Sequence, residues 1–162
     1  MRKIIVLILS VIVIGACSSI DCPVKNRVYT VYTLLKSNGT TDTLTVDTLT
    51  ILSHCANDSD TILLNHETNF SDFDIPISHT QPEDVLFLTL LDTLGNTYHD
   101  TIRVQKENYQ HFESVDCQAT YFHKLTGVSS THHIIDTIEI NNPTVNYDAT
   151  NEHFHIYFKA RY

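Results

Sequence analysis

Histidines are the side chains whose number first points to chemistry in this sequence, which contains ten of them. His153 and His155 are two residues apart in an alternating segment, so on a β-strand their rings would point the same way. Two imidazoles on one face are a start for a zinc or copper site, and His132-His133 could add a third ligand. Adjacent histidines on a strand face opposite sides, however, and Lys159 would place positive charge on the face of His155. We therefore expect exposed strand residues here and assign no metal site.

The motifs of common enzyme classes do not occur in the chain. The sequence has no GxSxG, no glycine-rich phosphate loop, and neither an HExxH nor a CxxC pattern. The segment NDSDTILLNHE, which begins at Asn57, has two spaced acids but then apolar residues where a calcium loop requires oxygen ligands and glycine. Paired acids such as Glu83-Asp84 are expected on a solvated rim. We predict that the protein is not an enzyme and uses no cofactor.

The start of the chain has the features of a secretory signal. Arg2 and Lys3 precede an apolar run over residues 4–14, which is too short for a membrane-spanning helix of about 20 residues. The motif IGAC, which ends at Cys17, is similar to a bacterial lipobox, in which the cysteine is lipidated and becomes the new N-terminus. Cys17 is therefore the predicted lipid anchor.

This interpretation divides the chain into three parts. Residues 1–16 are the predicted lipoprotein signal peptide, residues 17–26 a lipidated tether, and residues 27–162 a single folded domain. Ser18 stands where lipoproteins retained in the inner membrane usually carry aspartate, which favours the outer membrane. Because acids are scarce near the cysteine, a surface-export signal is weak, and the periplasmic and cell-surface faces both remain open.

The charge balance excludes one class of partner. Without Arg2 and Lys3, the chain has 8 basic residues (10 − 2) against 19 acidic ones, a formal balance of about −11. Nucleic acid is not expected as a partner, because phosphate binding requires a positive surface. Anionic lipid headgroups would also repel the domain, so the acyl chains would have to hold it at the membrane.

Three cysteines remain once Cys17 is lipidated. Cys22, Cys55 and Cys117 allow three different single disulfides in an oxidising compartment, each with one thiol left over. We favour Cys22 with Cys117, because a bridge there would fix the first strand where the tether meets the domain, and Cys55 is the alternative partner. Only five residue steps then separate the lipid from the domain, at most about 18 Å of extended chain. The domain would lie against the membrane.

A short repeat also stands out. An Asp-Thr step followed by leucine or isoleucine occurs six times, against roughly one occurrence expected from composition. A structural origin is open, since aspartate suits a turn and the next two residues suit a strand. The triplet also resembles the acceptor of the general O-glycosylation system of Bacteroidota, in which the threonine carries the glycan. The candidates are Thr43, Thr48, Thr61, Thr93, Thr101 and Thr137, with Thr61 and Thr93 favoured because they stand near turn signals.

The elements that position these residues are strands. Period-two or short apolar runs recur roughly every ten to fifteen residues, and none is a convincing amphipathic helix. They predict about nine strands, at residues 27–35, 43–52, 61–64, 73–77, 85–91, 100–104, 119–125, 134–140 and 153–160. Short strands with turn residues between them, only 4 Gly and no βαβ rhythm indicate an all-β fold. We expect an antiparallel β-sandwich of immunoglobulin-like type, with a small β-barrel as the alternative.

The last third of the chain contains three distinctive segments, FESVDC, THHIIDTI and the closing HFHIYF. Together with the lipobox, this pattern over residues 107–158 resembles a family of uncharacterised Bacteroidota lipoproteins, a domain of unknown function. In that family glycine often follows the cysteine, whereas Gln118 stands here. The resemblance implies an envelope lipoprotein and brings no activity or catalytic residues with it.

Two classes of function follow. The preferred one is a noncatalytic outer-membrane lipoprotein that contacts an envelope protein or binds a glycan. It predicts an exposed aromatic patch, to which six tyrosines are candidates: Tyr29, Tyr32, Tyr98, Tyr109, Tyr121 and Tyr157. The alternative is a small-ligand or metal-binding lipoprotein, which requires side chains that converge on one pocket.

Overall fold

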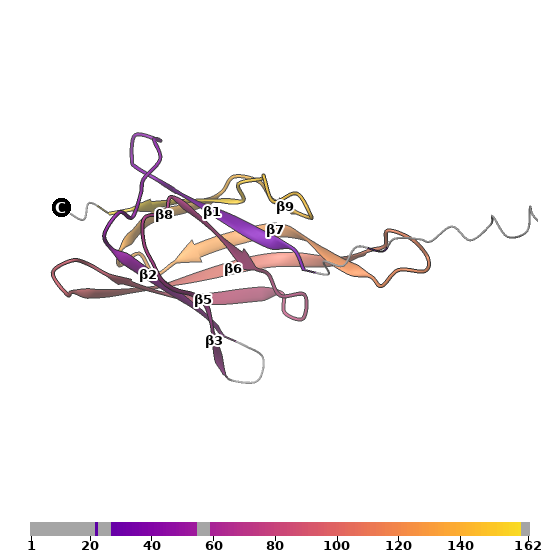
Figure 1. Cartoon of the computed structure of the whole chain (residues 1–162). Coiled ribbons are helices and arrows are strands. Elements are labelled where there is room, and N and C mark those ends of the chain that lie inside the picture. The colour runs from indigo at the N-terminus through magenta and orange to yellow at the C-terminus, as the bar shows by residue number, and fades with distance from the viewer. Residues whose placement is uncertain (1–21, 23–26, 55–58, 160–162) are drawn as a thin grey trace, which may run out of the picture.

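The computed structural model describes Cys22, residues 27–54 and residues 59–159. All regular secondary structure in these parts of the chain is β-strand (Figure 1). The strands are β1 (Tyr29–Leu35), β2 (Thr48–His54), β3 (Asp60–Glu67), β4 (Asp72–Pro76), β5 (Glu83–Leu91), β6 (Thr97–His111), β7 (Thr120–Ser130), β8 (Ile135–Ile140), β9 (Thr144–Val145) and β10 (Phe154–Phe158). Among the described residues there is no helix of the length and apolarity needed to cross a membrane.

The strands form two sheets that face each other. One has the order β4-β1-β10-β8 and the other β3-β2-β5-β6-β7-β9. Neighbouring strands run antiparallel, except that β1 and β10 run parallel. The predicted all-β sandwich is confirmed, and the described strands form two separate sheets rather than the alternative closed barrel.

Alternation along the strands explains how the core forms. In β5, Leu86, Leu88 and Leu90 are buried while Phe87 between them is exposed, as the period of two residues in a strand requires. The four-stranded sheet contributes an aromatic row at the centre. Tyr32 of β1 stacks on its two cross-strand partners, Phe73 of β4 at 5.0 Å and Phe154 of β10 at 4.7 Å between ring centroids. Such cross-strand ring pairs stabilise the pairing of the strands that carry them.

Every predicted strand has a counterpart in the structure, and the largest difference in length is in β6. The sequence predicts a strand at residues 100–104, whereas β6 runs from Thr97 to His111 and pairs along most of its length with β7. The added residues, QKENYQH, are polar and lack the apolar alternation on which the prediction depends. The two-residue strand β9 was not predicted because two residues form no pattern.

Two of the repeated Asp-Thr-aliphatic triplets have structural roles. The Asp92 carboxylate accepts hydrogen bonds from the backbone N–H groups of Leu94 and Asn96, both at 2.8 Å, and from the Asn96 side chain, so it organises the β5–β6 turn. These bonds, those from Asn96 foremost, hold the pKa of Asp92 below its usual value. Gly95 completes the turn with a φ of 87°, a conformation that favours glycine.

Asp100 connects the two sheets. It lies on β6 with its side chain buried and accepts the backbone N–H of Ile134 at 2.9 Å and of Ile135 at 2.8 Å, where the chain enters β8 of the other sheet. The hydroxyl of Thr131 also donates to it. Burial raises the pKa of this carboxyl, but its hydrogen bonds lower it by more, so the pKa lies below its usual value. The aspartate therefore satisfies backbone donors at the crossover between sheets.

Candidate ligand pocket

A cavity of about 510 Å³ lies between the two sheets. Its walls come from β1 and β4 on one side and from β2, β3, β5, β6 and β7 on the other, with the segment 77–80 at its edge. Apolar wall residues include Val28, Ile75, Leu86 and Val104, and the polar ones are Arg27, Thr30, Ser53, Thr61, Ser78, His79, Thr80, Asp84, Tyr121 and His123. Small-molecule sites are typically apolar clefts of about 300–1,000 Å³ with a few polar groups that orient the ligand. The volume and lining of this cavity match that description.

A buried ion pair lies at the pocket wall. Lys106 Nζ is 2.8 Å from Asp84 Oδ2, and the side chain of Lys106 has no exposed surface. Asp84 also accepts the backbone N–H of Ser78 at 3.2 Å, which ties the segment after β4 to β5. Burial lowers the pKa of the Lys106 ammonium, and the neighbouring Asp84 reverses part of this effect. The carboxylate on the pocket wall is thus already paired with a cation.

Position along the strands explains why both charges point inward. Asp84 is in phase with the buried residues Leu86 and Leu88 of β5, and Lys106 is in phase with Ile102 and Val104 of β6. The expectation that Asp84 lies on a solvated rim is therefore wrong. Because Asp84 is directly opposite Val104 in the register, Lys106 is its diagonal neighbour, within reach of a long side chain. The β5–β6 turn fixes this register, so the pair could have been found from the hairpin signal and the in-phase charges.

His123 is a neutral hydrogen-bond acceptor in the pocket wall. Asn108 donates through Nδ2 to the carbonyls of His79 and Gln81, both at 3.1 Å, which fixes its amide orientation. Its Oδ1 is 2.7 Å from His123 Nδ1, so Nδ1 carries the proton and Nε2 is the acceptor. Burial, with smaller contributions from Lys106 and His79, lowers the pKa of His123 to about 4. The imidazole is therefore uncharged at neutral pH.

Two aromatic rings stack on each other at the pocket edge. His79 and Tyr121 stack with their centroids 4.5 Å apart and their planes 17° apart. The hydroxyl of Tyr121 accepts a hydrogen bond from Gln110 Nε2 at 3.0 Å, which orients the phenol. Stacked rings of this kind offer an apolar face next to polar atoms. Together with Asp84 and His123, they can bind a small molecule that has both hydroxyl groups and a C–H face.

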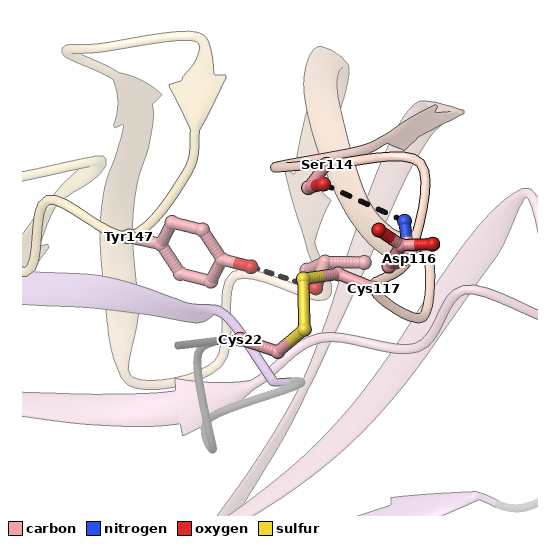
Figure 2. The surroundings of a disulfide bond; sticks show 6 residues. Cys22, Ser114, Asp116, Cys117 and Tyr147 are labelled. Atoms are coloured by element: carbon pink, nitrogen blue, oxygen red, sulfur yellow. Dashed lines mark hydrogen bonds between the residues drawn. A yellow bond between two sulfur atoms is a disulfide. The ribbon is translucent and has the colours of Figure 1, made fainter. Parts of the chain in front are cut away.

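The favoured disulfide, Cys22–Cys117, is present. It lies just before the start of β7, whereas the crossover to β8 follows the end of β7. Cys22 and Cys117 are bonded, with their Cα atoms 5.5 Å apart (Figure 2). The backbone N–H of Cys117 donates to the carbonyl of Ser114 at 3.2 Å, so the bond attaches to a turn in the loop between β6 and β7. The lipidation candidate Cys17 and the alternative partner Cys55 lie outside the described residues.

The structure corrects the expectation for His153. This residue precedes β10 rather than lying in it, and its side chain is fully buried instead of exposed. The backbone N–H of Val31 donates to His153 Nδ1 at 3.0 Å, so the ring caps the start of β1. His155 is half-buried, and its Nε2 lies 3.0 Å from Glu152. No group of three or more metal-ligating side chains gathers among the residues that the structure describes.

The six candidate glycosylation threonines differ in exposure. Thr43, Thr61, Thr93 and Thr137 are exposed, whereas Thr48 and Thr101 are half-buried. The hydroxyl of Thr48 is buried without a hydrogen-bond partner, which makes it a poor acceptor for a bulky glycan. Thr93 lies in the β5–β6 turn, and Thr61 on β3 also lines the pocket.

The six candidate tyrosines do not form one patch. Tyr32 is in the core, Tyr121 and Tyr157 are half-buried, and Tyr29, Tyr98 and Tyr109 are exposed. Tyr98 and Tyr109 lie near opposite ends of β6, which separates them along a 15-residue strand. The pocket, rather than a shared tyrosine surface, is where aromatic and polar groups converge.

An all-β sandwich with a ligand-sized pocket between its sheets is the class of protein that the fold and the site define. A family model described as a family of unknown function (DUF6452) matches residues 48–158, which span β2 to β10. The chain belongs to this family, so the expected membership in an uncharacterised family is confirmed. No curated protein and no solved structure gives a significant match to the chain.

Proposed function

We propose that this protein is a noncatalytic outer-membrane lipoprotein of Bacteroidota type that binds a small neutral sugar in the pocket between its sheets. The lipobox at Cys17 and the acidic composition support the location. The observation that carries the binding function is the pocket itself, with an aromatic surface, a paired carboxylate and a neutral histidine around one cavity of about 510 Å³. The sequence also led us to expect contact with an envelope protein, and that contact remains a proposal as well.

The electrostatics of the wall favour a neutral ligand. Asp84 already has its counterion in Lys106, so a cationic ligand would find no unpaired carboxylate among the described lining residues, and the other charged lining residue, Arg27, is exposed to solvent. His123 and Asp84 supply acceptors for hydroxyl donors, while the stacked Tyr121 and His79 supply an apolar face for the C–H groups of a sugar ring. A pKa of about 4 also makes His123 a weak base near neutral pH, which favours binding over proton-transfer chemistry.

Calorimetric titration of the full chain with neutral monosaccharides and their disaccharides tests the binding function. We expect at least one sugar to bind, and Tyr121→Ala to weaken it by about tenfold, about 1.4 kcal/mol. Tyr98→Ala is the matched control, because Tyr98 is an exposed tyrosine that does not line the pocket, and it should bind like the wild type. The proposal fails if no sugar binds, or if the two variants bind equally well.

Intact-mass spectrometry tests the anchor and the modification separately. Protein made in a Gram-negative host should begin at Cys17 and carry the mass of attached acyl chains, and Cys17→Ser should lose that mass. A mature chain that begins elsewhere contradicts the anchor. In protein from its own cells, we expect sugar-sized mass increments that disappear in Thr93→Ala, since Thr93 is exposed in a turn.

A further inference from the structure

Four aromatic or apolar side chains are exposed at the end of the β6–β7 hairpin. They are Tyr109 at 44%, Phe112 at 57%, Val115 at 97% and Tyr147 at 37% exposure, and we call them the end patch. The loop that carries Phe112 and Val115 extends beyond the two sheets, at the right of Figure 1. Apolar side chains gathered at one projecting end of an acidic protein indicate a contact surface.

Ring contacts hold the end patch in place. Tyr109 and Tyr147 both pack edge-on against Phe122 of β7, with centroids 6.2 Å and 5.0 Å away. His111 stacks on the same ring at 4.2 Å. The hydroxyl of Tyr147 donates to Thr120 at 2.7 Å, in the surroundings of the disulfide that Figure 2 shows. The two tyrosines of the patch are therefore packed against the fold, and Phe112 and Val115 lie beside them in the loop.

The disulfide ties the N-terminal segment to the end patch. Cys117 follows Val115 by two residues in the same loop and is bonded to Cys22. Five residue steps join Cys22 to the lipidation candidate Cys17, at most about 18 Å of extended chain. A lipid on Cys17 is thus confined to the end of the molecule that carries the patch.

We propose that the end patch inserts into the headgroup region of the bilayer that holds the lipid anchor, an inference that rests on the proposed lipidation of Cys17. Tyrosine rings favour this region, because it accommodates an apolar ring and a polar hydroxyl together, and Phe112 adds apolar surface that can reach the acyl boundary. Glu113 and Asp116 flank the apolar residues, so the surface fits zwitterionic rather than anionic headgroups. Insertion fixes the orientation of the domain, with β6 leading away from the membrane.

A single tryptophan reports insertion directly, because the chain contains none. Val115→Trp places it in the end patch, and Leu94→Trp places it at the opposite end of β6, where Leu94 is 85% exposed. The 15 residues of β6 separate the two positions by about 50 Å. Both substitutions are at exposed positions, so neither disturbs the core.

The experiment uses the full lipidated chain reconstituted into phosphatidylcholine vesicles whose acyl chains carry bromine near the headgroups. On reconstitution into these vesicles, we expect the Val115→Trp emission to shift to shorter wavelength and to fall at least about twofold. The Leu94→Trp emission should stay as it is without vesicles. If the protein floats with the vesicles but both tryptophans behave alike, insertion is wrong while the anchor stands. If the protein does not float with the vesicles, the anchor itself is wrong and the inference fails with it.

Discussion

The buried ion pair between Asp84 and Lys106 at the pocket wall allows its contribution to folding stability to be tested by mutation. Asp84→Asn leaves the fully buried Lys106 ammonium without its counterion at 2.8 Å. Breaking a buried pair in this way costs about 3–5 kcal/mol. The Asp84 side chain is 12% exposed, so some water reaches the site, and we expect a cost near the lower limit, about 3 kcal/mol.

Lys106→Met keeps the length of the side chain and removes its charge. Asp84 then retains the N–H of Ser78 and its partial exposure, so we expect a smaller cost of about 1–2 kcal/mol. The double variant removes both charges and leaves only the polar side chain of Asp84→Asn, whose oxygen can still accept the N–H of Ser78, so it should lie within about 1 kcal/mol of the wild type. The two single changes should therefore be strongly non-additive.

Urea unfolding with the disulfide intact measures these differences. Glu83→Gln is the matched control. It removes the neighbouring pair between Glu83 and Arg103, which has a similar distance of 3.0 Å but whose side chains are 34% and 55% exposed, and it should cost less than about 1 kcal/mol. If Asp84→Asn costs no more than Glu83→Gln, or if the two single changes add, the pair does not act as a buried unit and the reasoning is refuted.

Three further predictions concern pH, the crossover and the disulfide. The pKa of His123 falls from 6.5 to about 4 on folding, so between these values the unfolded chain binds a proton that the native state does not. This contribution to stability is complete above about pH 6.5 and decreases by up to about 3 kcal/mol as the pH falls towards 4. Urea unfolding across this range should show a smaller decrease in His123→Asn, and an equal decrease would contradict the assignment. Asp100→Ala leaves the buried N–H groups of two residues at the start of β8 without an acceptor and should cost about 4 kcal/mol in thermal or urea unfolding, whereas a loss under 1 kcal/mol would refute its role between the sheets. Reduction of the Cys22–Cys117 bond, which closes a loop with a sequence separation of 95, should lower stability by about 2–5 kcal/mol, and a Cys22→Ser variant should show no further loss on addition of reductant.

The strands were predictable because a strand with one buried face leaves a period of two in the sequence. Residues 73–77 and 153–160 show this clearly, and the structure places β4 and β10 there. The signal fails where the buried face is polar. In the second half of β6 the buried residue is the charged Lys106, and its exposed neighbours are also polar. Burial therefore alternates along this segment while hydropathy does not. Pairing with β7, which the sequence does not display, keeps this segment extended.

The candidate site was less accessible to sequence reasoning because it depends on contacts between distant segments. Asp84 on β5 and His123 on β7 come together because both strands pair with β6, and His79 lies in the segment between β4 and β5, where the chain passes from one sheet to the other. The same reason explains the error at His153. Alternation places it on an outer face, but the ring lies near the start of β1, more than 120 residues away in sequence, and the backbone N–H of Val31 donates to its Nδ1 there.

The parallel pairing of β1 with β10 determines when the fold can be completed. The backbone N–H of Val31 and the ring of His153 are separated by 122 residues, so the four-stranded sheet requires one of the longest loop closures available to this chain. Synthesis delivers β1 first and β10 last, and β4 can cover only one side of β1 in the meantime. The other side stays an unpaired strand edge until β10 emerges, and such edges pair readily with other chains. The newly made chain is therefore most prone to aggregate in the interval before its last strand arrives.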